Sequence, residues 1–358
     1  MAYIEIDLEK IRYNTKFLKN LLEKKGISIF AITKLVLGDP VIAKAIFDAG
    51  IEYIGDSRID NIIKMREAGI KAKLILIRNP SVSEIPQVIK YADISLNSEL
   101  QVVKMLSEEA KRQNKLHGII LMVEMGDLRE GIMPNTLEPI VKQIIDLKGV
   151  ELLGIGTNLK CFAGVIPDDT NMIEFSTIAE NIQNQFGIKL KFISGGNSAN
   201  YNWVRSSKNI GLINNLRLGT AILMGLESIK DSPVIELEQN IFTLVGEIVQ
   251  INKKPKTPKG KFTTNAFGEP SIFKSKKIRG RGFRTQALLN IGRQDIIESG
   301  LVPIANIEIL GASSDYLIID VKNNKFKVGD KIKFNMSYES VLRAMTSPFI
   351  EKIFFSRI

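Results

Sequence analysis

The stretch Ile27–Lys34, Ile-Ser-Ile-Phe-Ala-Ile-Thr-Lys, is a short apolar run that ends on a lysine. A run of this length, rich in β-branched and aromatic residues, predicts a buried β-strand. In α/β barrels the carboxyl ends of the strands form the rim where binding groups lie. Most lysines that follow a strand are only solvated, so Lys34 gains meaning from the residues that accompany it.

Strand-like runs alternate with helix-like segments through about residue 228. The predicted strands are Ile27–Lys34, Tyr53–Asp56, Leu74–Arg78, Ile94–Leu96, Ile119–Glu124, Leu152–Thr157, Phe192–Gly195 and Leu216–Thr220. The predicted helices include Pro40–Ala49, Arg58–Ala68, Ser83–Tyr91, Glu99–Gln113 and Leu137–Leu147. Eight alternations predict an α/β fold of the (β/α)₈ TIM-barrel type, with an open doubly wound sheet as the alternative.

The ends of these predicted strands are often polar or glycine. They are Lys34, Asp56, Arg78, Glu124, Thr157 and Gly195. Polar residues on the binding rim favour an enzyme, although loops also begin in this way.

The sequence after about residue 230 is β-rich and has little helical periodicity. Its predicted strands are Phe242–Ile251, Gln286–Ile291, Asn306–Ile309, Tyr316–Val321 and Lys331–Asn335, and the opening Ala2–Asp7 could add another. We therefore expect two domains: a barrel over residues 8–230, and a C-terminal all-β domain over 231–358 that includes residues 1–7.

The size and composition are those of an ordinary globular protein. The chain has 358 residues, of which 44% are hydrophobic and 25% charged, enough to bury a sizeable core. No apolar run approaches the roughly 18 residues of a membrane span. The acidic opening does not resemble an export signal, and a single cysteine, Cys161, excludes an internal disulfide. These features predict a cytoplasmic protein.

The net charge of +10 raises the possibility of a nucleic-acid partner. Much of the excess lies in Lys253–Lys261 and Lys274–Arg284, which are rich in proline or glycine and predict solvated loops. No nucleic-acid-binding motif accompanies them, so we expect no such partner. The chain has one histidine, His117, which we interpret as structural or exposed; a metal-dependent mechanism is disfavoured.

Six stretches, in this order along the chain, carry a family resemblance. They are Ile32–Pro40, Gly55–Arg58, Gly126–Gly131 (Gly-Asp-Leu-Arg-Glu-Gly), Gly156–Pro167, Ser194–Tyr201 and Ile291–Asp295 (Ile-Gly-Arg-Gln-Asp). Because of these stretches, essentially the whole chain resembles the alanine racemase superfamily of fold-type III pyridoxal phosphate (PLP) enzymes. Within this superfamily it resembles the ornithine-racemase branch. The resemblance implies PLP as cofactor, an amino acid as small-molecule substrate, and a homodimer whose sites lie at the subunit interface.

The resemblance implies a role for each matching residue around the cofactor. Lys34 corresponds to the lysine that forms the internal aldimine and then acts as a base. Arg217 corresponds to the arginine that faces the pyridine nitrogen and, by keeping its own proton, leaves that nitrogen unprotonated. The residues that match contacts of the phosphate are Asn197, Ser198, Gly219, Thr220 and, from the second domain, Tyr338. Taken alone, Gly-Gly-Asn-Ser is more often a turn, and Tyr338 could simply pack between domains.

Arg129 corresponds to the arginine associated with the substrate carboxylate, a task that suits a bidentate guanidinium. In Gly-Asp-Leu-Arg-Glu-Gly it could equally form a local ion pair with Glu130 or Asp127.

The chain departs from the family pattern in three places. The stretch Gly292-Arg293-Gln294-Asp295 lacks the tyrosine that serves as second base in typical alanine racemases. The aromatic residue shortly after the PLP lysine is absent, and Asn158 replaces a histidine near the ring.

Racemisation through a planar carbanion still requires a proton donor on each face. Cys161 is the first candidate for the missing role, because a thiol with a lowered pKa exchanges protons near neutrality. The alternative is that it is an inert buried cysteine. Arg293 or Asp295 of a partner subunit are further candidates, and Lys34 could serve both faces.

The same departures argue against alanine as the sole substrate. Ser314 and Asp315 fall near the family's active-site loop, and Asp315 could pair with the terminal ammonium of ornithine or lysine. With Arg129 and Asn158 they form the expected substrate-binding set. Structural carboxylates are commoner, so this remains a hypothesis.

The sequence thus predicts a PLP-dependent racemase for a basic amino acid, or for a broad range of amino acids. The alternatives are an alanine racemase proper, a fold-type III decarboxylase, a metal-assisted D-amino-acid aldolase or dehydratase, and a non-catalytic PLP-binding protein.

Overall fold

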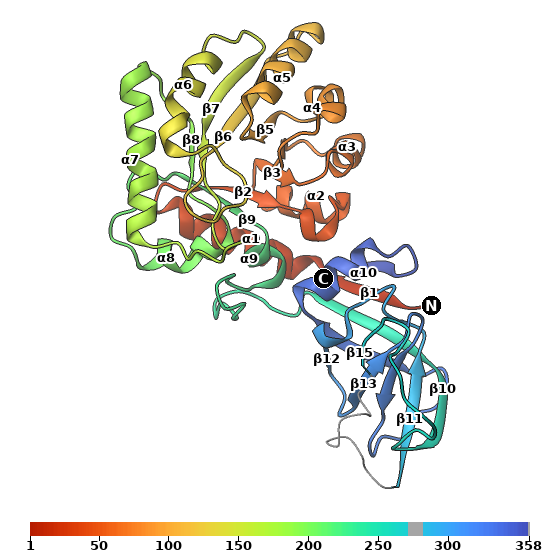
Figure 1. Ribbon diagram of the computed structural model, residues 1–358. Coiled ribbons are helices and arrows are strands. Elements are labelled where there is room, and N and C mark those ends of the chain that lie inside the picture. Colours follow the sequence, from red (N-terminus) through yellow and green to blue (C-terminus); the bar gives the residue numbers. More distant parts are fainter. Residues whose placement is uncertain (271–281, 357–358) are drawn as a thin grey trace. The chain divides into compact units, whose positions relative to one another are not determined.

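The structure, a computed structural model, describes residues 1–270 and 282–356 (Figure 1). The chain forms two compact units, Leu8–Gln239 and Met1–Asp7 with Asn240–Ile358. Residues 231–239, which the sequence prediction placed in the second domain, are part of the first unit. Of the predicted basic loop Lys274–Arg284, residues 274–281 lie outside the described residues.

The first unit is a closed barrel of eight parallel strands, which excludes the open-sheet alternative. The strands are β2 (Ser28–Ile32), β3 (Tyr53–Asp56), β4 (Lys73–Leu76), β5 (Ile94–Asn97), β6 (His117–Met122), β7 (Val150–Gly156), β8 (Phe192–Ser194) and β9 (Asn215–Leu218). The helices are α1 (Leu8–Glu23), α2 (Pro40–Asp48), α3 (Ile59–Glu67), α4 (Ile85–Tyr91), α5 (Leu100–Arg112), α6 (Pro134–Ile144), α7 (Asp169–Phe186), α8 (Tyr201–Ser206) and α9 (Thr220–Met224). Figure 1 shows them outside the ring of strands.

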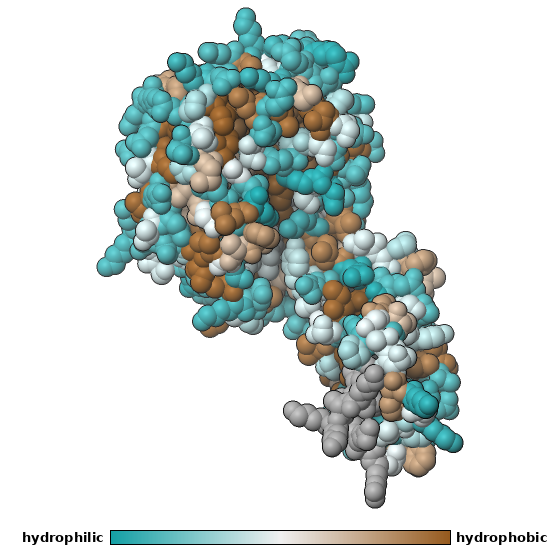
Figure 2. Space-filling view, in the orientation of Figure 1, coloured by the Kyte–Doolittle hydropathy of each residue, from teal (hydrophilic) through white to brown (hydrophobic). Residues whose placement is uncertain are grey.

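Apolar side chains from different strands fill the barrel. This core comprises Phe30, Ile32, Ile75, Ile94, Leu96, Ile120, Met122 and Phe192. Close strand pairing also requires glycine: a Cβ at Gly154 would lie 1.9 Å from the carbonyl oxygen of Phe192. Outside the barrel, α5 buries Val103, Leu106 and Ala110, the spacing of an amphipathic helix. Polar side chains cover much of the visible surface (Figure 2).

The strand register brings three separate chain segments to one part of the barrel rim. Ala31 of β2 pairs with Leu218 of β9, and Ser194 of β8 pairs with Asn215 of β9. Because all three strands run parallel, the residues that follow them emerge at the same end of the barrel. Lys34, Ser198 and Thr220 are carried by these segments.

The second unit is dominated by β-strands. Its strands are β1 (Tyr3–Asp7), β10 (Phe242–Pro255), β11 (Phe283–Leu289), β12 (Leu301–Pro303), β13 (Glu308–Ala312), β14 (Leu317–Asp320), β15 (Lys331–Met336) and β16 (Glu351–Phe355). They pair in the order β12-β15-β10-β11-β14-β13, and β1 joins β10 antiparallel and β16 parallel. The predicted strand at Ala2–Asp7 is thereby confirmed.

Two details of this unit were predicted wrongly. One helix, α10 (Tyr338–Thr346), interrupts the strands; the side chain of Ser337 caps it by accepting from the amide of Ser340, and Val341 and Ala344 are buried. In addition, Lys253–Pro255 are not loop residues, since they extend β10 against β11. The lysines there stay on the surface, with the Lys253 ammonium 5.5 Å from the ring centre of Phe283.

His117 is a buried structural residue at the start of β6. Its side chain is 2% exposed, and the Nε2 atom lies 2.9 Å from Ser95 Oγ. Burial lowers the pKa of His117 to about 4, so the ring is neutral in the folded protein at pH 7.

We expect acidification to destabilise the protein through His117. In the unfolded chain the imidazole takes up a proton near pH 6.5, whereas in the fold it resists protonation down to about pH 4. The stabilising contribution of the neutral ring is complete above pH 6.5 and is lost as the pH falls toward 4. At pH 5 the loss in the free energy of unfolding is about 2 kcal/mol. Urea unfolding at pH 7 and pH 5 measures the change in the free energy of unfolding. In His117→Gln this change should be smaller by the contribution of the imidazole. Since the chain has one histidine, an NMR titration that gave its imidazole an ordinary midpoint would contradict the expectation.

None of the helices in the described ranges combines the length and apolar character needed to cross a membrane.

Candidate active site

Lys34 lies directly beyond β2, as the first residue of the 3₁₀ turn Lys34–Val36. Its side chain is exposed, and within the described parts of the chain its Nζ atom makes no hydrogen bond or ion pair. The chain then turns sharply, with Leu37 at φ 51° and Gly38 at φ 59°, and enters α2 at its cap residue Asp39. The lysine therefore offers a free amine at the barrel rim.

A buried carboxyl group supports the residue before the lysine. Thr33 Oγ1 donates to Asp56 Oδ2 at 2.9 Å, and Asn61 Nδ2 donates to Asp56 Oδ1 at 2.8 Å. Asp56 is fully buried, and this burial raises its pKa above the ordinary value. A Cβ at Gly38 would lie 2.8 Å from Asn61 Cβ. The turn that carries Lys34 is thus fixed at both ends. Sequence reasoning found Asp56 only as a polar strand end, and it missed Thr33 and Asn61.

Ser198, Gly219 and Thr220 come together from two separate segments. Ser198 is 3% exposed, and its Oγ atom accepts a hydrogen bond from the amide of Ala221 at 3.2 Å. Ala221 is in the first turn of α9, which begins at Thr220. A Cβ at Gly219 would lie 3.2 Å from the carbonyl oxygen of Ile32, next to the lysine turn. The backbone approach of β9 to β2 therefore favours glycine at this position.

Arg217 of β9 is a buried guanidinium. It is 5% exposed; one terminal nitrogen donates to Ser194 Oγ at 2.7 Å, and the other donates to the Thr157 carbonyl at 2.6 Å and to Asn158 Oδ1 at 3.3 Å. It takes part in none of the ion pairs among the described residues. Burial lowers the pKa of Arg217 to about 10, so it keeps its proton at pH 7. A buried cation without a carboxylate is costly, and a functional group is often the reason for one.

Asn197 connects the segment after β8 with the segment after β7. Its Nδ2 atom donates to Asn158 Oδ1 at 3.0 Å and to the Leu159 carbonyl at 2.8 Å, and it lies 3.6 Å from Cys161 Sγ. Its Oδ1 atom accepts from the amide of Ala199 at 2.8 Å. Asn197 therefore positions its neighbours. Cys161 is exposed, so the alternative of an inert buried cysteine is wrong.

A second buried carboxylate, Asp127, holds the segment that carries Cys161. Asp127 is 1% exposed, and its side chain accepts from the amides of Cys161 at 3.0 Å, Phe162 at 2.9 Å and Gly164 at 3.2 Å. Three amide donors on one carboxylate fix the loop after β7 to the loop after β6. Asp127 appeared in the sequence analysis only as a possible partner of Arg129.

We expect Asp127→Ala to release the loop of residues 158–166. Loss of three charge-assisted hydrogen bonds should lower the free energy of unfolding by about 2–4 kcal/mol, and the amides at 161, 162 and 164 should exchange with solvent at least about tenfold faster. Hydrogen exchange read by mass spectrometry tests this. Asp39→Ala, which removes a helix cap on the same barrel, is the control; equal exchange in both variants would refute the role of Asp127.

Arg129 and Glu130 form an ion pair through Nε and a terminal nitrogen of the arginine. Partial burial opposes the charge of Arg129, but the bond to Glu130 and the nearby negative groups outweigh it and raise its pKa. Of the two sequence interpretations, the local ion pair is therefore the one seen in the structure. A substrate carboxylate at Arg129 must compete with Glu130.

The second unit brings together three of the predicted residues, Arg293, Ser314 and Asp315, although Arg293 lies about 20 positions before the other two in the sequence. The amides of Arg293 and Gln294 donate to the carbonyls of Ser313 and Ser314 at 2.9 and 3.2 Å, and Gln294 Nε2 donates to Asp315 Oδ1 at 2.7 Å. A Cβ at Gly292 would lie 2.1 Å from the Ser314 carbonyl oxygen, so this turn requires glycine. Tyr338, at the start of α10, belongs to the same unit.

The two candidate second bases in this unit are occupied by structural contacts. Arg293 pairs with Glu298 and Glu269, and these bonds raise its pKa, so it does not release a proton near neutrality. Asp295 is 7% exposed and accepts from Ser347 Oγ at 2.6 Å. We therefore do not retain Arg293 as a base.

The residues at the barrel mouth fit PLP by their chemistry. Lys34 supplies a free amine, Ser198 and the Gly219–Thr220 backbone lie where an anion could be held, and Arg217 supplies a cation without a carboxylate partner. In addition, Asn158 Nδ2 is buried and has no hydrogen-bond partner among the described residues. An orphaned buried donor beside an unpaired guanidinium is expected where a ligand completes the contacts.

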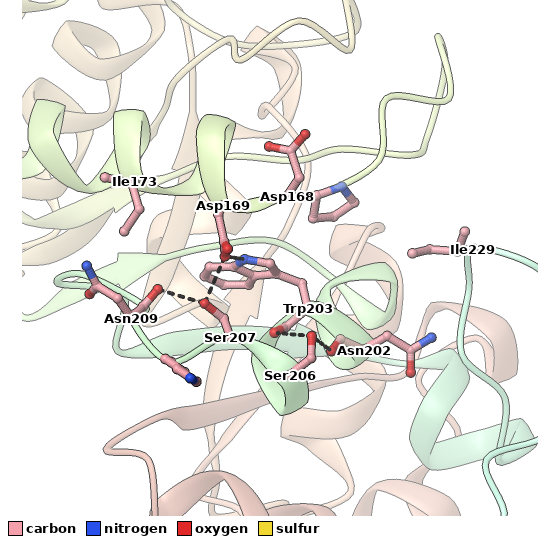
Figure 3. Close-up of a pocket in the computed structure, with 11 residues that line it drawn as sticks. Asp168, Asp169, Ile173, Asn202, Trp203, Ser206, Ser207, Asn209 and Ile229 are labelled. Atoms are coloured by element: carbon pink, nitrogen blue, oxygen red, sulfur yellow. Dashed lines mark hydrogen bonds between the residues drawn. The ribbon is translucent and has the colours of Figure 1, made fainter.

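A pocket of about 770 Å³ lies outside this group of residues, between the start of α7 and α8. Figure 3 shows Asp169 joined by dashed lines to Trp203 and to Ser207. Asp169 accepts from Trp203 Nε1 and from Ser207 Oγ, both at 2.8 Å, and these bonds lower its pKa. The carboxylate thereby ties α8 to α7, and none of the predicted site residues lines the pocket.

The sequence matches a known family model and several curated proteins. The model, described as "Alanine racemase, N-terminal domain", matches residues 6–227. The chain is 40% identical over 353 residues to ornithine racemase of Acetoanaerobium sticklandii, covering 98% of each protein. It is 35% identical over 351 residues to lysine racemase of Thermotoga maritima, covering 98% of this chain and 97% of that protein. Alanine racemase of Fusobacterium nucleatum is 26% identical over 92% of this chain and 90% of that protein.

Solved structures show the same fold. An alanine racemase of Clostridium difficile 630 superposes with a TM-score of 0.77 at 18% identity, over 99% of this chain and 96% of that one. A D-threonine aldolase from Filomicrobium marinum superposes with a TM-score of 0.72 at 14% identity, over 96% of this chain and 88% of that one. Proteins named for two different reactions share the fold, so the reaction has to be argued from residues.

Proposed function

Because the chain belongs to the alanine racemase family, we propose that it is a PLP-dependent racemase that interconverts the enantiomers of a basic amino acid such as ornithine or lysine. The observation that carries the proposal is similarity over 98% of the chain to an ornithine racemase and a lysine racemase. The alanine racemase of Fusobacterium nucleatum is more distant, at 26% identity. The free amine of Lys34 and the unpaired Arg217 support the same chemistry.

Bound at Lys34, PLP would supply an electron-withdrawing ring that weakens the Cα–H bond of an attached amino acid. The side chains of this protein would perform the remaining tasks. Lys34 Nζ would carry a proton to and from Cα. Ser198, Gly219 and Thr220 would hold the phosphate in one position. Arg217, which stays protonated, would direct its donors at a fixed point in the barrel mouth.

Cys161 remains our candidate for the second proton carrier. Its thiol is exposed and lies 3.6 Å from Asn197 Nδ2, and Asp127 fixes its backbone. Cys161 interacts electrostatically with Arg129 and Arg217, which places this thiol near both guanidinium groups. Cys161→Ser should therefore slow proton exchange at Cα more than it weakens substrate binding.

We further propose that the protein is a homodimer that works in the cytoplasm. Exposed apolar side chains on the loops after β6 and β7 support an interface: Leu128, Met133, Phe162 and Ile166 are 69, 53, 73 and 51% exposed. Asp127 joins these two loops. Light scattering after gel filtration should give twice the mass of one chain, and Phe162→Glu should shift the protein toward the monomer.

A panel of L-amino acids in D₂O tests the proposed function. The holoenzyme should convert L-ornithine or L-lysine into a mixture of both enantiomers and exchange the Cα hydrogen for deuterium, with alanine as the poorer substrate. Chiral chromatography and NMR measure both. Release of carbon dioxide from L-ornithine would instead identify a decarboxylase, and absence of exchange with every amino acid would favour a non-catalytic PLP-binding protein.

A further inference from the structure

The loop after β6 presents Glu130 in a fixed position. The Val123 and Ile132 backbones pair at its base, and Glu124 Oε1 accepts from the amides of Gly126 at 2.6 Å and Leu128 at 3.0 Å. Gly131 has φ 147°, and a Cβ there would lie 2.4 Å from the Glu124 nitrogen. The residue beside Glu130 is therefore restricted to glycine, and the loop cannot easily shift.

Glu130 is a carboxylate that interacts electrostatically with two cations, Arg129 and Arg217. It forms the ion pair with Arg129 and is the more covered partner, with a side chain 22% exposed against 41% for Arg129. Its charge is also the main influence that favours the charged form of the buried Arg217, against the effect of burial. Glu130 thus forms an ion pair with Arg129 and favours the charge of Arg217 without an ion pair between them.

This arrangement creates a charge problem for a neutral substrate. If the substrate's α-carboxylate binds Arg129, it displaces Glu130 at least in part, because both anions use the same donors. A side chain such as that of alanine then leaves Glu130 without its partner in a partly covered place, which is unfavourable. A side chain that ends in an ammonium group supplies a replacement cation.

We propose that Glu130 receives the terminal ammonium of a diamino-acid substrate, so that binding exchanges the Arg129–Glu130 ion pair for two new ones. Arg129 then holds the α-carboxylate and Glu130 holds the distal amine. This inference rests on the proposed function and adds the residue that selects for a basic side chain. It replaces Asp315, the candidate from the sequence, whose Oδ1 atom already accepts from Gln294 at 2.7 Å.

Steady-state kinetics of Glu130→Gln tests the proposal with two substrates that have the same carbon chain. These are L-ornithine and L-norvaline, which lacks the terminal amine. The variant should lower the kcat/KM ratio of ornithine over norvaline at least about 20-fold, mainly through the KM of ornithine, as expected for loss of a charged contact. Where norvaline does not turn over, its inhibition constant replaces its KM. Glu130→Asp keeps a carboxylate and should retain most of the preference.

Glu84→Gln is the matched control. Glu84 pairs with Arg78 after β4, and its side chain is also 22% exposed. It should leave the ornithine-to-norvaline ratio unchanged. If the ornithine-to-norvaline ratio of Glu130→Gln stays within threefold of the wild type, the inference is overturned while the proposed function stays intact. The same holds if only Asp315→Asn lowers this ratio. A wild-type enzyme that racemises neither ornithine nor lysine would overturn both.

Discussion

Lys34→Ala should abolish racemisation, with kcat at least about 10⁴-fold lower, since both the covalent attachment of the cofactor and a proton carrier are lost. The purified variant should also lack the yellow colour of the attached cofactor, and borohydride reduction should leave no cofactor on the peptide around residue 34. Peptide mass mapping measures that directly. The large effect is expected because the Lys34 amine has no other partner in the described parts of the chain.

Lys44→Ala is the control for this prediction. Lys44 lies on α2, and its ammonium pairs with Asp48 at 2.8 Å on the surface. Its removal should change neither colour nor rate. If Lys34→Ala kept the cofactor on another lysine and retained turnover, the assignment of position 34 would be wrong.

Arg217→Met should reduce turnover at least about 100-fold, the cost of removing a preorganised donor from an active site. The protein should nevertheless stay folded. Methionine has a similar length, and loss of the buried charge offsets the hydrogen bonds that Ser194 and the Thr157 carbonyl lose, so we expect the free energy of unfolding to change by less than about 2 kcal/mol.

Arg205→Met provides the comparison, because Arg205 on α8 pairs with Glu236 on the surface at 2.8 Å. This variant should keep full activity. Urea unfolding and racemisation assays of both variants separate a role in catalysis from one in stability. A fivefold or smaller loss of turnover in Arg217→Met would contradict the role that we give it.

The barrel could be predicted because its strands are short runs that are rich in apolar residues. The predicted strand Tyr53–Asp56 has the bounds of β3, and the predicted helix Pro40–Ala49 matches α2 to within one residue. The local sequence of such a run is enough to predict that the strand is buried. By contrast, β12 has three residues, and β16 alternates exposed with half-buried positions, so neither stands out from its surroundings.

The support around the predicted site residues could not be predicted in the same way. Asp127 meets the amides of residues 161–164 only because two loops from neighbouring strands converge, and Thr33 meets Asp56 for the same reason. Nothing in either local sequence signals the contact. Similarly, the sequence makes Arg293 a candidate base, but in the fold it pairs with Glu269 from a distant loop. Charge partners of this kind depend on the fold.

Strand β1 has a consequence for synthesis on the ribosome. Residues 3–7 emerge first, yet they pair with residues 242–245 of β10 and with β16, which emerge last. The barrel sequence from Leu8 to Gln239 is complete before either partner is available. During that interval the nascent chain carries an unpaired strand containing Tyr3, Ile4 and Ile6, the kind of edge that recruits other chains. Slow synthesis of the barrel should therefore promote aggregation, because it lengthens the time for which this strand has no partner.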